Sequence, residues 1–110
     1  MNFIIIHGVY ASPEANWFPW LKKELESRGY EAIVPKFTTP LDQSLESWLR
    51  VFSSYESKVN EETVLIGHSL GASFILNYLE KTSKKIKAAY LVAPFHKLLG
   101  VEYDEINKTF

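Results

Sequence analysis

The most informative stretch of the chain runs from Thr63 to Leu76 and reads Thr-Val-Leu-Ile-Gly-His-Ser-Leu-Gly-Ala-Ser-Phe-Ile-Leu. Its first four residues are mostly apolar and β-branched, which predicts a buried strand over 63–66. The residues from Leu70 to Thr82 have the length and apolar spacing of a helix. Between the two, Ser69 stands two residues from a glycine on each side. The sequence therefore predicts a strand, a sharp turn that carries a serine, and a helix.

The turn has the Gly-x-Ser-x-Gly spacing of a nucleophile elbow. Gly67 and Gly71 lack the Cβ atoms that would collide with the neighbouring strand and helix, so Ser69 can adopt a strained backbone with positive φ. Ser69 Oγ would then be exposed at the carboxyl edge of the sheet, and the N–H of Leu70 would point toward an oxyanion formed there. A glycine turn that merely happens to hold a serine is the simpler alternative, which the flanking strand and helix disfavour.

The rest of the chain alternates between short apolar runs and longer amphipathic segments, a pattern typical of βα units. Strands are expected over 3–6, 30–34, 63–66 and 88–92, and helices over about 18–28, 43–57 and 70–82. Because connections between parallel strands are right-handed, the most economical architecture is a parallel four-stranded sheet with helices on both faces. We therefore expect one three-layer α/β/α domain over residues 1–110.

Two groups of large side chains are expected in the core. The first lies at spacings of three and four in the second helix and comprises Leu45, Trp48, Leu49, Phe52 and Tyr55. The second comprises Trp17, Phe18 and Trp20. We expect this second group to be mostly core, with the lining of an acyl pocket as the alternative.

Composition excludes several classes of function. The 110 residues include 12 Lys and Arg against 13 Asp and Glu, for a net charge of −1. We therefore expect neither a nucleic-acid partner nor an anionic membrane surface. The absence of cysteine excludes disulfides, thiolate catalysis and Cys-ligated zinc. No apolar run approaches the roughly 18 residues of a membrane span. These features favour a cytoplasmic protein, and the nucleophile elbow described above favours a small-molecule acyl substrate.

The first strand ends in His7-Gly8, and the loop that follows would lie beside Ser69 if the first and third strands are neighbours. Such a loop supplies a second donor to an oxyanion. The best candidate is the backbone N–H of Val9, with that of Tyr10 next. Gly8 would let the main chain approach the reacting carbonyl closely.

Three histidines are candidates for a general base. His7, at the end of a buried strand, is expected to be a hydrogen-bonded structural histidine. The side chain of His68 is expected to diverge from that of its neighbour Ser69, which makes it a poor base. His96, just past the fourth strand, is the one histidine placed to face the site, although an exposed loop histidine is the simpler description.

With these residues the chain resembles the α/β-hydrolases and, among them, the small YdeN-like and retinoblastoma-binding-protein-nine-like serine hydrolases. The resemblance covers nearly the whole chain. Its most particular stretches are His7-Gly8 with Ala11-Ser12, residues 16–23, and His68-Ser69-Leu70-Gly71 followed by Ile75-Leu76.

The resemblance implies that Ser69 is the nucleophile and that the N–H groups of Leu70 and of the loop after Gly8 bind the oxyanion. It implies a strand order of 2-1-3-4, with the strand over 88–92 at an edge that longer relatives cover. We therefore expect a homodimer, or another chain, at that edge. Family members are longer and take the triad Asp and His from two further strand–loop units, so the chain is expected to be the amino-terminal portion of the fold.

A triad from within the chain is the alternative. The carboxylates Glu102, Asp104 and Glu105 follow the fourth strand, although a solvated charged segment explains them more simply. The family order places a histidine after the acid, and no histidine follows His96. A rearranged triad would have to combine Ser69, His96 and one of these carboxylates.

Taken together, the sequence predicts a serine hydrolase that acts on ester or other acyl substrates through an acyl-enzyme on Ser69, with activity impaired in this short chain. No metal or organic cofactor is expected, because the motif requires none. A non-catalytic interaction module derived from a hydrolase fold is the competing prediction. A two-chain enzyme completed by a separate partner is a third.

Overall fold

The computed structural model describes residues 1–93 of the 110-residue chain. The elements follow the expected alternation of strands and helices. They are β1 (Asn2–Ile6), α1 (Phe18–Ser27), β2 (Glu31–Ile33), α2 (Leu45–Phe52), the 3-10 helix η1 (Ser53–Lys58), β3 (Thr63–His68), α3 (Leu70–Lys81) and β4 (Ala88–Val92).

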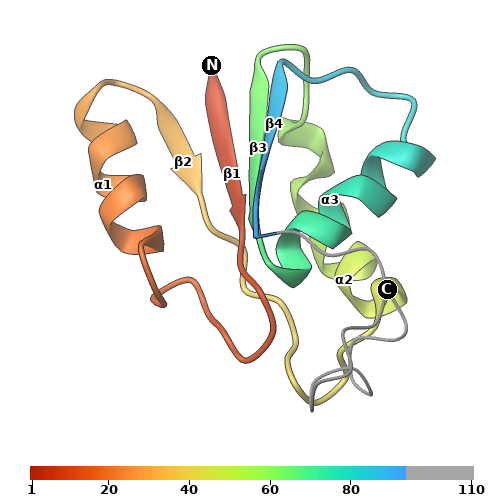
Figure 1. Ribbon diagram of the computed structural model, residues 1–110. Coiled ribbons are helices and arrows are strands. Elements are labelled where there is room, and N and C mark those ends of the chain that lie inside the picture. The colour runs from red at the N-terminus through yellow and green to blue at the C-terminus, as the bar shows by residue number, and fades with distance from the viewer. Residues whose placement is uncertain (94–110) are drawn as a thin grey trace.

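The four strands form one parallel sheet in the order β2-β1-β3-β4, as expected. The central pair, β1 and β3, is in register from Asn2 opposite Thr63 to Ile6 opposite Gly67. Helix α1 covers one face of the sheet, and α2 and α3 cover the other (Figure 1). This arrangement confirms the three-layer α/β/α architecture and brings the carboxyl ends of β1 and β3 side by side.

Two hydrophobic clusters lie on opposite faces of the sheet, because successive strand residues point to opposite faces. Toward α1 lie Ile5, Phe18, Val64 and Ile66. Toward α2 and α3 lie Ile4, Ile6, Leu65, Trp48, Phe52 and Phe74, among others. The three isoleucines of β1 are fully buried. The unbroken apolar run of β1 therefore reflects a strand covered on both faces.

The structure differs from the sequence-based expectation in two places. The predicted second helix ends at Phe52 and continues as the 3-10 helix η1. Trp20, expected with the core, is 64% exposed. It follows Phe18 by two positions in α1, and about 200° of helical rotation carries it to the opposite side from the buried Phe18.

Strand β4 lies at the edge of the sheet and pairs with β3. Within residues 1–93 no strand lies on its other side, and Tyr90 and Val92 are 60% and 40% exposed. The expected edge position is thus confirmed. Over the same residues, none of the helices has the length and apolar character that a bilayer crossing needs.

Candidate active site

Ser69 occupies the sharp turn between β3 and α3. Its φ of 55° and ψ of −118° lie outside the helical and extended regions, and the positive φ confirms the expected strain. A non-glycine residue in such a conformation costs about 1–3 kcal/mol, so the surrounding structure must hold it there. The N–H of Ser69 donates to the carbonyl of Val92 (2.8 Å), and its carbonyl accepts from the N–H of Ala72 (3.0 Å).

The two glycines that flank Ser69 are required by close backbone contacts. A Cβ atom added to Gly67 would lie 2.7 Å from the backbone of Gly71 and from the Ala72 nitrogen. A Cβ on Gly71 would overlap the carbonyl oxygen of Ile6 at the end of β1 and lie 2.7 Å from that of His7. Because these neighbours are backbone atoms, no side-chain rotation relieves the overlap. Glycine at both positions therefore lets α3 begin directly against the end of β1.

The loop after β1 lies beside Ser69. A Cβ on Gly8 would be 3.2 Å from Ser69 Cβ and 3.6 Å from the Leu70 nitrogen. The loop turns at once, because the N–H of Ala11 donates to the Gly8 carbonyl (3.3 Å) and Tyr10 adopts a φ of 56°. The close approach expected of Gly8 is therefore present.

Two backbone N–H groups next to Ser69 are candidates for binding an oxyanion. Leu70 is the first residue of α3, so its N–H has no acceptor within the helix. Val9 lies in the turn that begins at Gly8. Neither N–H donates a hydrogen bond to another residue in the described part of the chain. Both can therefore donate to a bound group.

His7 is a structural histidine, as expected. Its side chain is fully buried, and both ring nitrogens are hydrogen-bonded. Nδ1 lies 2.9 Å from the Gly8 carbonyl oxygen, and Nε2 accepts from the N–H of Phe37 (2.9 Å). Burial lowers the pKa of His7 below its ordinary value. Because both nitrogens are engaged, His7 is a poor general base.

His68 lies among aromatic side chains from the start of α1. Its ring meets those of Trp17 and Phe18 edge-on, at centroid distances of 5.8 and 6.0 Å. Its buried Nδ1 has no hydrogen-bond partner in residues 1–93. No hydrogen bond joins it, or His7, to Ser69 Oγ among these residues. This placement agrees with the expectation that His68 diverges from the serine.

The remaining candidates for the base and acid are His96, Glu102, Asp104 and Glu105, which lie outside the described residues. Their roles stay predictions. The described residues bring together Ser69, Leu70 and the Val9 loop.

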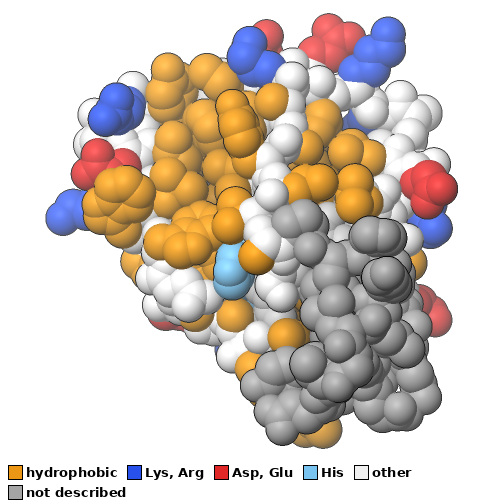
Figure 2. All heavy atoms as spheres, in the orientation of Figure 1, with side chains coloured by type: hydrophobic (Ala, Val, Ile, Leu, Met, Phe, Trp, Pro, Cys, Tyr) orange, Lys and Arg blue, Asp and Glu red, His pale blue; other side chains and the backbone are white. Residues whose placement is uncertain are grey.

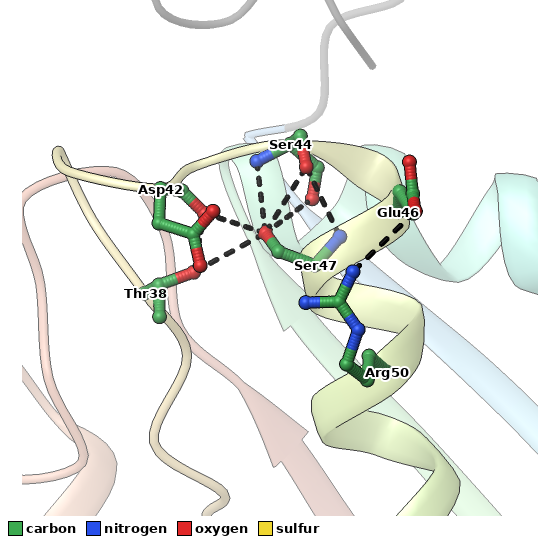
Figure 3. A network of polar contacts seen from close by, with 6 residues as sticks. All are labelled: Thr38, Asp42, Ser44, Glu46, Ser47 and Arg50. Atoms are coloured by element: carbon green, nitrogen blue, oxygen red, sulfur yellow. Dashed lines mark hydrogen bonds and ion pairs between the residues drawn. The ribbon is translucent and has the colours of Figure 1, made fainter.

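The loop between β2 and α2 also contacts the site, which the sequence analysis missed. Thr39 Oγ1 accepts from the N–H of Tyr10 (2.8 Å), and the Phe37 N–H donates to His7. Only the end of this loop carried a local signal, a capping box formed by Ser44 and Ser47 at the start of α2 (Figure 3).

An open apolar groove of about 560 Å³ runs along the α1 face of the sheet. It is lined by Phe3, Trp17, Leu21, Leu25, Ile66, Tyr90 and Val92. Figure 2 shows hydrophobic side chains gathered over α1 and the neighbouring strands on this face. Trp17 thus lies between core and surface, where it contacts both Phe18 and the groove.

Comparison with known proteins gives a consistent family. The sequence model of the serine hydrolase family matches residues 3–109 of this chain. The putative hydrolase YdeN of Bacillus subtilis strain 168 is 42% identical over 97 residues, which are 86% of this chain and 51% of that protein. The serine hydrolase RBBP9 of Rattus norvegicus is 30% identical over 95 residues, 86% of this chain and 50% of that protein. The chain thus spans about half the length of the curated relatives it matches.

Solved structures agree with the fold. The crystal structure of the Bacillus subtilis ydeN gene product matches with a TM-score of 0.83 at 38% identity, over 98% of this chain and 59% of that one. An extracellular α/β-hydrolase from a Paenibacillus species matches with a TM-score of 0.72 over 89% of this chain and 42% of that one. At 22% identity, this second match shows a shared fold alone.

Proposed function

The chain belongs to the serine hydrolase family, and from this premise we propose that it cleaves ester or other acyl substrates with Ser69 as nucleophile. The observation that carries the proposal is the positive φ of 55° at Ser69, held between β3 and α3 by Gly67 and Gly71. A strained serine persists only where the surrounding structure enforces it, and such strain clusters at active sites.

In the proposed reaction, Ser69 Oγ attacks the acyl carbonyl carbon and gives up its proton to a base. The carbonyl electron pair moves to the oxygen, where the N–H groups of Leu70 and Val9 stabilise the negative charge. Collapse of this intermediate expels the leaving group, which takes up the proton. Water then attacks the acyl-enzyme in the same manner and releases the acid.

The base is the part of the proposal that the described residues leave open. His7 is excluded because both of its nitrogens are hydrogen-bonded. We propose that residues 1–110 form one incomplete α/β-hydrolase domain that holds the nucleophile and the oxyanion donors. The base is then His96 or a histidine outside the chain. Without a base Ser69 keeps an alcohol-like pKa, so its hydroxyl attacks slowly at neutral pH.

A non-catalytic interaction module is the second candidate, and it is favoured by the apolar groove and by the edge of β4, which no other strand of residues 1–93 covers. We propose that a second copy, or another chain, covers the edge of β4. Light scattering of the purified chain at high concentration tests this point, and a monodisperse monomer would contradict it. The cytoplasmic location expected from the sequence stays a prediction.

The test of the proposed function is reaction with a fluorophosphonate probe, followed by mass spectrometry. Ser69→Ala should abolish labelling. Ser53→Ala, which removes an exposed serine just past the end of α2, is the control that should leave labelling unchanged. Because an incomplete domain without its base should label slowly, the parent chain is followed over a long incubation, and only a complete lack of labelling at Ser69 would favour the interaction module.

A further inference from the structure

The Gly8–Val9 peptide next to Ser69 is held by the side chain of His7. Nδ1 of His7 lies 2.9 Å from the Gly8 carbonyl oxygen. A carbonyl only accepts, so Nδ1 carries the proton. The N–H of Phe37 donates to Nε2, which must therefore be unprotonated. The two bonds together fix a single neutral tautomer of His7.

This bond on the carbonyl also determines where the Val9 N–H points. The carbonyl of Gly8 and the N–H of Val9 belong to one planar trans peptide, in which the two groups point in opposite directions. Because His7 holds the carbonyl, the Val9 N–H is directed away from the buried imidazole. It cannot turn without breaking the His7 bond.

The following peptide, Val9–Tyr10, is held from the other side by Thr39. The N–H of Tyr10 donates to Thr39 Oγ1 (2.8 Å), and the Thr39 hydroxyl donates onward to Gln43 Oε1 (2.6 Å). Tyr10 has a φ of 56°, a left-handed conformation that is strained for a non-glycine residue. The hydrogen bond to Thr39 offsets this strain and keeps the peptide from flipping to an unstrained turn.

Thr39 is itself held in place by a hydrogen-bonded loop. Its neighbour Thr38 donates to the Asp42 carbonyl (2.7 Å), and the Thr38 carbonyl accepts from Trp48 Nε1 (2.7 Å). Ser47 joins the same network at the start of α2 (Figure 3). The loop is therefore a fixed support for the Thr39 hydroxyl.

We propose that His7 and Thr39 are positioning residues, which hold the peptides on either side of Val9 so that the Val9 N–H stabilises the oxyanion formed at Ser69. This inference rests on the proposed function. Neither side chain touches the reacting atoms, and each acts through the orientation of the main chain.

Thr39 provides the first test, with the rate of Ser69 labelling by a fluorophosphonate as the readout. Loss of an oxyanion donor lowers the rate by about 10²–10³-fold, and a donor that points in the wrong direction should lower it by a smaller factor. Thr39→Val keeps the shape but loses the acceptor, so labelling should slow by about tenfold or more. Thr39→Ser restores the hydroxyl and should label like the parent. The matched control is Thr82→Val, which makes the same substitution at the carboxyl end of α3, the opposite end of that helix from Ser69.

His7 provides a test with a directional outcome. In His7→Asn the side-chain amide N–H falls near Nδ1 and can still donate to Gly8. In His7→Gln the amide oxygen falls near Nε2 and can still accept from Phe37. We expect the Asn variant to label faster than the Gln variant. The reverse order would mean that His7 merely anchors the Phe37 loop, and would overturn its positioning role. If urea denaturation shows that either His7 variant is already unfolded without urea, the labelling rates of the Thr39 variants decide whether the proposal holds.

A second readout separates this inference from the proposed function. In Thr39→Val, the amide signals of Val9 and Tyr10 in ¹⁵N NMR should broaden through peptide exchange on the microsecond to millisecond timescale, and in Thr39→Ser they should not. Labelling that survives Ser69→Ala would overturn the proposed function. The positioning role would be overturned if Thr39→Val and Thr39→Ser labelled at equal rates. If the parent chain is not labelled, unchanged amide signals in Thr39→Val would overturn it instead.

Discussion

Gly71→Ala should destabilise the protein by an amount that follows from its contacts. The added methyl group would overlap the Ile6 carbonyl oxygen and lie 2.7 Å from that of His7. Both obstacles belong to the main chain at the end of β1, so relief requires α3 to move away from the sheet. Overpacking of this kind costs about 1–3 kcal/mol and occasionally more. Since the obstacle is rigid backbone, we expect at least about 3 kcal/mol.

Gly29→Ala is the matched control for this substitution. Gly29 has a φ of 86°, and a Cβ there would meet no atom within 4 Å. The control therefore includes conformational strain of about 1–2 kcal/mol without a steric overlap. Both substitutions lower the conformational entropy of the unfolded chain by the same amount, so this entropic contribution to the free energy of unfolding cancels in the comparison. Gly71→Ala should therefore cost at least about 1–2 kcal/mol more than Gly29→Ala, even though only the control carries the strain of a positive φ.

Urea denaturation followed by circular dichroism measures both free energies of unfolding. Fluorophosphonate labelling of folded Gly71→Ala should also slow, because the movement of α3 separates the Leu70 N–H from the Val9 loop. If Gly71→Ala is no less stable than Gly29→Ala, the close contact between α3 and β1 does not restrain the turn, and the reasoning fails.

Three further predictions concern pH and catalysis. The depressed pKa of buried His7 means that the unfolded chain binds a proton more readily, so the free energy of unfolding should fall as the pH drops below about 6.5, and less so in His7→Phe. Burial raises the pKa of Tyr78 to about 12, so the protonated Tyr78 hydroxyl should contribute fully to the free energy of unfolding below pH 10, and this contribution should be lost as the pH rises toward 12. In alkaline denaturation, Tyr78→Phe should remove this pH dependence. The chain alone should hydrolyse p-nitrophenyl esters very slowly, because loss of the base removes about 10⁶ of a full rate. Brisk ester hydrolysis that Ser69→Ala abolishes would contradict this prediction. If His96→Ala abolished the hydrolysis as well, a rearranged internal triad would be favoured.

The turn at Ser69 follows from local sequence, whereas the exposure of Trp20 and the end of α2 do not. The residues that form the turn at Ser69 are contiguous in the sequence, and the two glycines permit its backbone geometry through local sterics. The strand, turn and helix could therefore be predicted. The expected burial of Trp20 is wrong, because sequence proximity to the buried Phe18 does not place the two side chains on one face of a helix. One turn of α1 places them on different sides of the helix. The break between α2 and η1 likewise has no simple local signal.

The parallel α/β architecture, the turn at Ser69 and the glycines that permit the turn can be predicted from local sequence. These features depend on hydrophobic periodicity and on which residues lack a Cβ atom, both of which can be read within a few neighbouring positions. The hydrogen bonds from Phe37 to His7 and from Tyr10 to Thr39 cannot be predicted in this way, because they join residues 30 and 29 positions apart in the chain. A hydrogen bond needs its two groups within about 3 Å, and no local pattern specifies which distant loop supplies the partner, because the sheet must first bring the two loops together.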